Sequence, residues 1–226
     1  MNMNMFEQFS SPEFLMLPSM PLSMLLPLLL IYHKPKLLGN RITTATIIFL
    51  KTIMLNMTNQ LTADGQKWCR ILLSLLIMIL LSNILGLLPY TFTTTSQLSM
   101  NMAMAIPLWL ATVITGITKK PTQALAHMLP EGSPTTLIPF MIMIETISLF
   151  MRPLALGVRL TANITAGHLL MTMVSSATLN FISTNMLLSF LTSILLFMLI
   201  LLELAVACIQ AYVFVLLIIL YLQENT

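Results

Sequence analysis

The chain has 226 residues, of which 58% are hydrophobic and only 8% are charged. Soluble domains carry about 25% charged residues, so a soluble fold of this length could not cover its apolar residues. The net charge is +3, but the basic residues lie between apolar segments and form no stripe with interleaved aromatics, which excludes a nucleic-acid interface.

The first apolar segment runs from Phe14 to Tyr32 and predicts one membrane span within an N-terminal section 1–33. Three prolines interrupt it, and spanning helices tolerate proline when neighbouring groups bond the freed carbonyls. Residues 1–13 contain two glutamates and no basic residue, unlike a cleaved signal. We therefore expect the first span to be retained.

A basic linker follows over residues 34–70. Within it, residues 42–61 mix apolar side chains with threonine, lysine, asparagine and glutamine, which is typical of a helix lying in the membrane interface. A solvated loop is the alternative interpretation.

Residues 71–117 predict a helical hairpin of two spans, 71–88 and 98–117, joined by an uncharged, threonine-rich connection. A second basic loop occupies residues 118–136. Since basic loops stay on the inner side of the membrane, we expect the N-terminus outside and the C-terminus inside.

The last section, residues 137–226, contains two apolar stretches of unusual length, 137–179 and 186–222. As helices they would be about 64 and 55 Å long, well beyond the roughly 30 Å of a bilayer core. We expect a strongly tilted, curved or kinked hairpin. The fold class is thus an all-α polytopic membrane protein with about five crossings and one interfacial helix.

Charged side chains inside the long pair are the main functional signal. An arginine at mid-bilayer costs about 2.5–3.5 kcal/mol on insertion scales, so such residues are rarely kept for packing alone. The pair contains Glu145, Arg152, Arg159, His168 and Glu203.

On a regular helix these residues form two polar faces. One face is expected to hold Glu145, Ser148, Arg152, Arg159 and Asn163, and the opposite face Thr161, His168, Thr172 and Ser175. On the next helix, Thr192, Glu203, Gln210 and Tyr221 share one stripe.

The loop between the long helices predicts how their residues face each other. A turn near residues 182–183 would place Arg159 opposite Val206, with Glu203 one turn outward and Gln210 one turn inward. Polar residues would then lead from both membrane surfaces toward Arg159. Arg152 is expected either as a counter-charge to Glu145 or as a further functional residue.

Three segments carry a resemblance to a known family. They are ETISLFMRPLALGVRLTANITAGHLL at 145–170, NILGLLP at 83–89 and ELAVACIQAY at 203–212. Together they resemble subunit a of the membrane sector of F-type ATP synthases, in its animal mitochondrial form. The resemblance extends over essentially the whole chain and is most specific around Arg159.

The resemblance implies a stator proton channel. Such a subunit carries out no chemistry on ATP and needs no cofactor or metal. Two half-channels would carry protons to and from carboxylates of a rotating ring, in the mitochondrial inner membrane. It implies that Arg159 separates the half-channels, that His168 and Glu203 lie on the inlet side and that Glu145 lies on the outlet side. Asn163 and Gln210 are expected as polar supports of the arginine.

The implied partners are the ring of rotor subunits, the peripheral stalk, other membrane-sector subunits and the lipid bilayer. Three rival classes remain. A secondary transporter or proton-pumping respiratory subunit would usually show internal repeats, and none is evident. A structural assembly subunit would not need two polar faces, and an intramembrane enzyme would need a nucleophile–base pair or a metal cluster.

Overall fold

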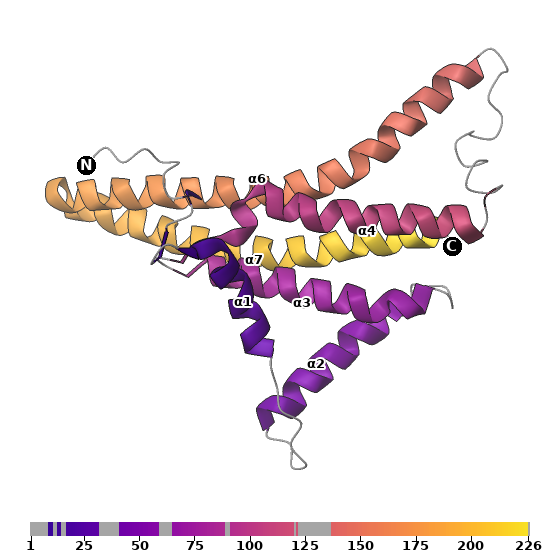
Figure 1. Cartoon of the computed structure of the whole chain (residues 1–226). Helices are drawn as coiled ribbons and strands as arrows, with labels where there is room; N and C mark the ends of the chain where they lie inside the picture. Colours follow the sequence, from indigo (N-terminus) through magenta and orange to yellow (C-terminus); the bar gives the residue numbers. More distant parts are fainter. Residues whose placement is uncertain are drawn as a thin grey trace. The chain divides into compact units, whose positions relative to one another are not determined.

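The computed structural model describes residues 9–10, 13–14, 17–31, 41–58, 65–88, 91–119, 121 and 137–225 (Figure 1). Nearly all of these residues are helical, which confirms the predicted all-α membrane protein. The helices are α1 (Ser19–Ile31), α2 (Arg41–Thr58), α3 (Cys69–Gly86), α4 (Leu98–Lys119), α6 (Ile138–Thr184) and α7 (Met186–Asn225). Short 3-10 helices η2 (Gly65–Trp68) and η3 (Thr94–Ser96) and a two-residue antiparallel ladder, β1 (Glu13–Phe14) with β2 (Leu17–Pro18), complete the described part.

Four of the described helices are long and apolar enough to cross a membrane: Gly65–Gly86, Leu98–Lys119, Ile138–Thr184 and Met186–Gln223. They correspond to four of the five predicted crossings. The fifth contains α1, whose 13 residues rise only about 20 Å, so its crossing stays a prediction. The helix expected within residues 42–61 is present as α2, and its place at the membrane surface also stays a prediction.

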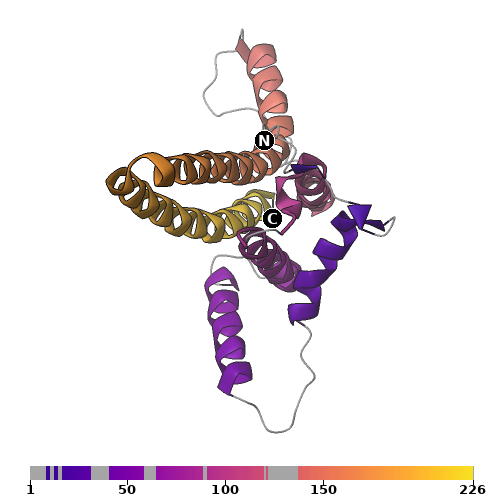
Figure 2. The same ribbon diagram turned by 90° about the vertical axis from the view of Figure 1, so that its left-hand side faces the viewer.

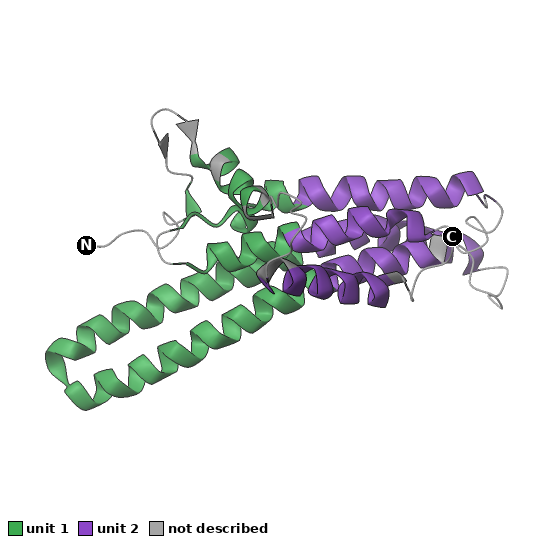
Figure 3. Cartoon of the chain, turned by 90° about the horizontal axis from the view of Figure 1, so that it is seen from below, with its two compact units in different colours: residues 1–31, 78–101, 158–212 green, residues 32–77, 102–157, 213–226 purple. Residues whose placement is uncertain are grey.

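The described helices belong to two compact units (Figure 3). Unit 1 comprises residues 1–31, 78–101 and 158–212, and unit 2 comprises residues 32–77, 102–157 and 213–226. Most of the predicted basic loop 118–136 lies outside the described residues.

In unit 1, the end of α3 is closed by a threonine. The hydroxyl oxygen of Thr91 lies 2.7 Å from the carbonyl oxygen of Leu88 and 2.8 Å from that of Leu85, and its single proton can be donated to either of them. The same two carbonyls also accept from the backbone N–H groups of Thr91 and Leu88. Gly86 allows the chain to fold back, because a Cβ there would stand 3.0 Å from Thr93 Cγ2. Within the threonine-rich connection, Thr93–Ser96 are buried.

Unit 1 also contains the connection of the long pair, which differs from the expected one. The turn expected near residues 182–183 lies instead at Asn185, the only residue between α6 and α7. Hydroxyls of Ser183 and Thr184 donate to carbonyls of the preceding turn, so α6 continues to its last residue. Figures 2 and 3 show the adjoining segments of α6 and α7 running side by side from this connection.

Unit 2 has regular apolar faces on its helices. Cys69, Leu72 and Leu76 are buried on α3, while Phe214, Val215, Ile218, Ile219 and Leu222 are buried on α7. Both sets recur at helical spacing and therefore mark one face of each helix. On α6, Gly157 lies so close to Met102 that a Cβ would stand 3.5 Å from Met102 Cγ.

Candidate functional site

Arg159 emerges from an apolar surface of unit 1. Its side chain is exposed on α6, and its neighbours Val158 and Ala162 are exposed as well. No residue in the described part of the chain forms a hydrogen bond or ion pair with the guanidinium. An unpaired charge is costly at membrane depth, so this group is suited to binding an anionic group.

Glu203 of unit 1 is buried, in contrast to the exposed Arg159. Its side chain is only 8% exposed, and Ala207 and Ala211, one and two turns further along α7, are buried on the same face. Small residues let neighbouring helices approach closely in membranes. Asn83 of α3 uses this space, because its Nδ2 donates to the carbonyl oxygen of Ala207 at 3.4 Å.

Gly167 of α6 lies directly against the carboxyl group of Glu203. A Cβ built on Gly167 would stand 2.9 Å from Glu203 Cδ and 3.3 Å from Cγ. Real Cβ atoms essentially never come within 3.0 Å of such an atom. The absence of a side chain at Gly167 thus makes room for the carboxyl group against α6.

Several buried polar atoms of unit 1 have no partner among the described residues. They include both carboxyl oxygens of Glu203, Nε2 of His168 and Oδ1 of Asn83, as well as side-chain oxygens of Ser19, Thr95 and Asn101. Buried polar atoms in proteins are normally bonded to protein groups or ordered water. Glu203 and His168 therefore keep hydrogen-bonding capacity that no described residue uses, and both side chains can bind and release a proton.

The pairing of α6 with α7 differs from the predicted register. Glu203 lies opposite Gly167 rather than one turn from Arg159, because the turn at Asn185 shifts the pairing of the two helices. Asn163 and Gln210 are half-buried, and no hydrogen bond joins either of them to Arg159. Their supporting role stays a prediction.

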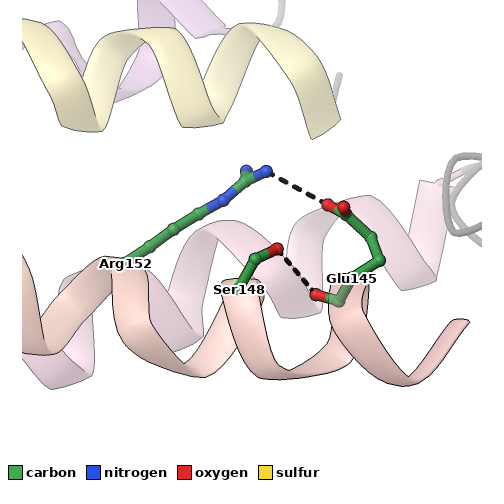
Figure 4. A network of polar contacts seen from close by, with 3 residues as sticks. All are labelled: Glu145, Ser148 and Arg152. Carbon is green, nitrogen blue, oxygen red and sulfur yellow. Dashed lines mark hydrogen bonds and ion pairs between the residues drawn. The ribbon is translucent and has the colours of Figure 1, made fainter. Parts of the chain in front are cut away.

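Glu145 lies in unit 2, where Arg152 is its partner (Figure 4). Arg152 Nη2 is 3.4 Å from Glu145 Oε1, so the expected counter-charge is present. Ser148, between them in sequence, donates its hydroxyl to the main-chain oxygen of Glu145 at 2.8 Å. The guanidinium carbon of Arg152 also lies 5.2 Å from the centre of the Tyr221 ring on α7.

Three residues near these groups were given no functional role from the sequence alone. Asn83 and Gly167 have no charge, and Tyr221 looked like one member of a polar stripe. Their contacts depend on how separate helices meet, which a single-helix pattern does not contain. For Asn83, the one signal in the sequence was a polar side chain inside an apolar span, which indicates packing against another helix.

Comparison with known proteins extends over the whole chain. The family model described as ATP synthase A chain matches residues 14–223. The chain is 78% identical over 226 residues to "ATP synthase F(0) complex subunit a" of Lycodon semicarinatus, with 100% of each chain covered. Proteins of the same description from Struthio camelus and Gadus morhua are 55% and 50% identical over 226 residues, again with 100% of each chain covered.

Proposed function

The chain belongs to the ATP synthase A chain family, and we propose that it is the stator proton channel of a rotary ATP synthase. In this function, two half-channels pass protons to and from carboxylates of a rotating ring, and the proton flow drives ATP synthesis elsewhere in the complex. The four membrane-length helices and the animal relatives support a multi-pass location in the mitochondrial inner membrane.

The observation that carries the proposal is the exposed, unpartnered guanidinium of Arg159 among the described residues. A carboxylate brought within about 4 Å of this charge gains about 4 kcal/mol at an effective dielectric constant near 20. That energy shifts the protonation equilibrium of the carboxylate about a thousandfold toward the ionised form. Arg159 would thus strip the proton from each rotor site that passes.

Arginine suits this role because it stays protonated under all working conditions. It cannot relay the proton itself, and its fixed charge repels a proton that approaches from either half-channel. A lysine in the same place could lose its proton when it is desolvated. Arg159 would therefore separate the two half-channels as well as discharge the rotor carboxylate.

Glu203 and His168 are proposed to line the inlet half-channel. Support comes from their unbonded polar atoms, from the burial of Glu203 and from the space that Gly167 provides. A glutamate and a histidine can each accept and release a proton, which arginine cannot. Asn163 and Gln210 are proposed as polar supports near Arg159.

Glu145 is proposed to serve the outlet half-channel. Its side chain is 36% exposed and its carboxylate is paired with Arg152. Because the basic loops belong on the inner side, the N-terminus would face the intermembrane space and the C-terminus the matrix. Protons would then leave near Glu145 on the matrix side.

The proposed partners are the rotor ring, the peripheral stalk, other membrane-sector subunits and the surrounding lipid. Cross-linking tests the rotor partner, using the assembled complex with Cys69 and Cys208 replaced by serine. Val158 is 44% exposed and Leu160 only 2% exposed, so Val158→Cys and Leu160→Cys form a matched pair on either side of Arg159. We expect Val158→Cys alone to cross-link to a small, carboxylate-bearing membrane subunit; no such product at position 158 would contradict the proposal.

A further inference from the structure

Arg152 makes contacts with two helices of unit 2 at once. Its guanidinium pairs with Glu145 of α6 at 3.4 Å and lies over the ring of Tyr221 of α7, 5.2 Å from the ring centre. A guanidinium within about 6 Å of a ring centre is attracted to the face of the ring. One cation is therefore held by a carboxylate on one side and by an aromatic ring on the other.

The ion pair between Arg152 and Glu145 does not by itself fix the conformation of the arginine. Glu145 and Arg152 are seven positions apart, which is a rise of about 10 Å along a helix. Helical side chains lean toward the N-terminus, so Arg152 leans toward Glu145 while Glu145 leans away from Arg152. Figure 4 shows the arginine extended along the helix and the carboxylate turned back to meet it.

Such an extended arginine needs a further contact to stay in one conformation. The side chain loses rotamer freedom on pairing, and both partners are partly exposed, at 30% for Arg152 and 36% for Glu145. Exposed ion pairs contribute little unless their geometry is fixed. The rigid ring of Tyr221 supplies a fixed surface for the guanidinium, from a helix that does not carry the carboxylate.

We infer that Tyr221 is a positioning residue for proton release: it holds Arg152 in the conformation that pairs with Glu145. The inference rests on the proposed outlet role of Glu145. Tyr221 acts through the face of its ring and not through its hydroxyl group. A phenylalanine can therefore replace it, whereas an aliphatic side chain of similar size cannot.

The test compares Tyr221→Phe, Tyr221→Leu and Tyr221→Met in assembled ATP synthase reconstituted in vesicles, with proton flux measured per assembled complex. We expect Tyr221→Leu and Tyr221→Met to lower the flux roughly three- to tenfold, and Tyr221→Phe to retain it. Phe150→Leu is the matched control, since this ring lies near Trp109 in the same unit, with 6.1 Å between ring centres; we expect normal flux.

A double-mutant cycle separates positioning from general packing. In a Glu145→Gln background, Tyr221→Leu should lower the flux by less than about twofold, because the carboxylate that Tyr221 positions is already gone. An equal loss in both backgrounds, normal flux in Tyr221→Leu, or loss of flux in Tyr221→Phe would each overturn the inference. If Tyr221→Leu does not assemble, Tyr221→Met decides by the same criteria.

The same experiment distinguishes this inference from the outlet role itself. Normal flux in Glu145→Gln would contradict the role of Glu145 and remove the basis of the inference. Slow flux in Glu145→Gln together with normal flux in both aliphatic variants at Tyr221 would overturn the positioning role alone.

Discussion

The carboxyl group of Glu203 lies against Gly167, so closely that a Cβ on that glycine would stand 2.9 Å from Glu203 Cδ. The two residues come from different long helices of unit 1. This contact places the carboxyl group against α6 at the residue that precedes His168 in sequence. A methyl group added at Gly167 of α6 would therefore displace the carboxyl group of Glu203 on α7.

Gly167→Ala should slow proton flux without preventing assembly. The new methyl group must displace the carboxyl group of Glu203, and because this group is the end of a flexible side chain it can move without unfolding the helix pair. Proton flux and the amount of assembled complex are measured separately. A second change, Glu203→Asp, shortens the side chain and should restore part of the flux.

Gly157→Ala is the matched control for this prediction, because it makes the same substitution in the same helix. There the new methyl group meets the flexible end of Met102 rather than a site carboxyl group. We expect nearly normal flux in this control. Equal flux in the two alanine variants would show that the contact between Gly167 and Glu203 has no functional weight.

Glu203→Gln and His168→Leu should each slow proton flux while the complex still assembles. Either change removes one of the two ionisable groups that we assign to the inlet half-channel. Since the two groups serve one path, the double variant should be little slower than the slower single variant. Normal flux in both single variants would refute the inlet assignment.

Residues 44 and 56 of α2 should be accessible from the same side of the membrane. Both lie on exposed positions of this helix, which we expect to lie flat on the inner surface. Thr44→Cys and Asn56→Cys are labelled in intact and in inverted vesicles with a reagent that cannot cross the bilayer. Labelling from opposite sides would show that α2 crosses the membrane. The predicted orientation of one end of the chain would then be wrong.

Arg159→Ala should abolish ATP synthesis and ATP-driven pumping, while passive proton movement persists or increases. Without the guanidinium, the interaction of about 4 kcal/mol that discharges the rotor carboxylate is absent, so coupled rotation stalls. The barrier to a proton passing directly between the half-channels falls for the same reason. Reconstituted vesicles report ATP synthesis and proton flux independently.

Arg159→Lys should be nearly as damaging as the alanine variant, because a desolvated ammonium group can lose its proton. It serves as the conservative comparison, since its chain length and nominal charge are close to those of arginine. ATP synthesis at a normal rate in either variant would mean that Arg159 is not the residue that discharges the rotor.

The class of protein, the long helices and the charged residues within them could be predicted from the amino-acid sequence. Those properties depend on the length of each apolar segment and on the free-energy cost of a charged side chain in hydrocarbon. Both can be read from a single segment of the sequence. Which residues of different helices face each other became clear only from the packing of the helices. The turn at Asn185 sets Glu203 against Gly167, the small residue Ala207 lets Asn83 approach, and α7 brings Tyr221 over Arg152. Such contacts depend on the register and spacing of separate helices, and a periodic pattern within one helix does not specify either.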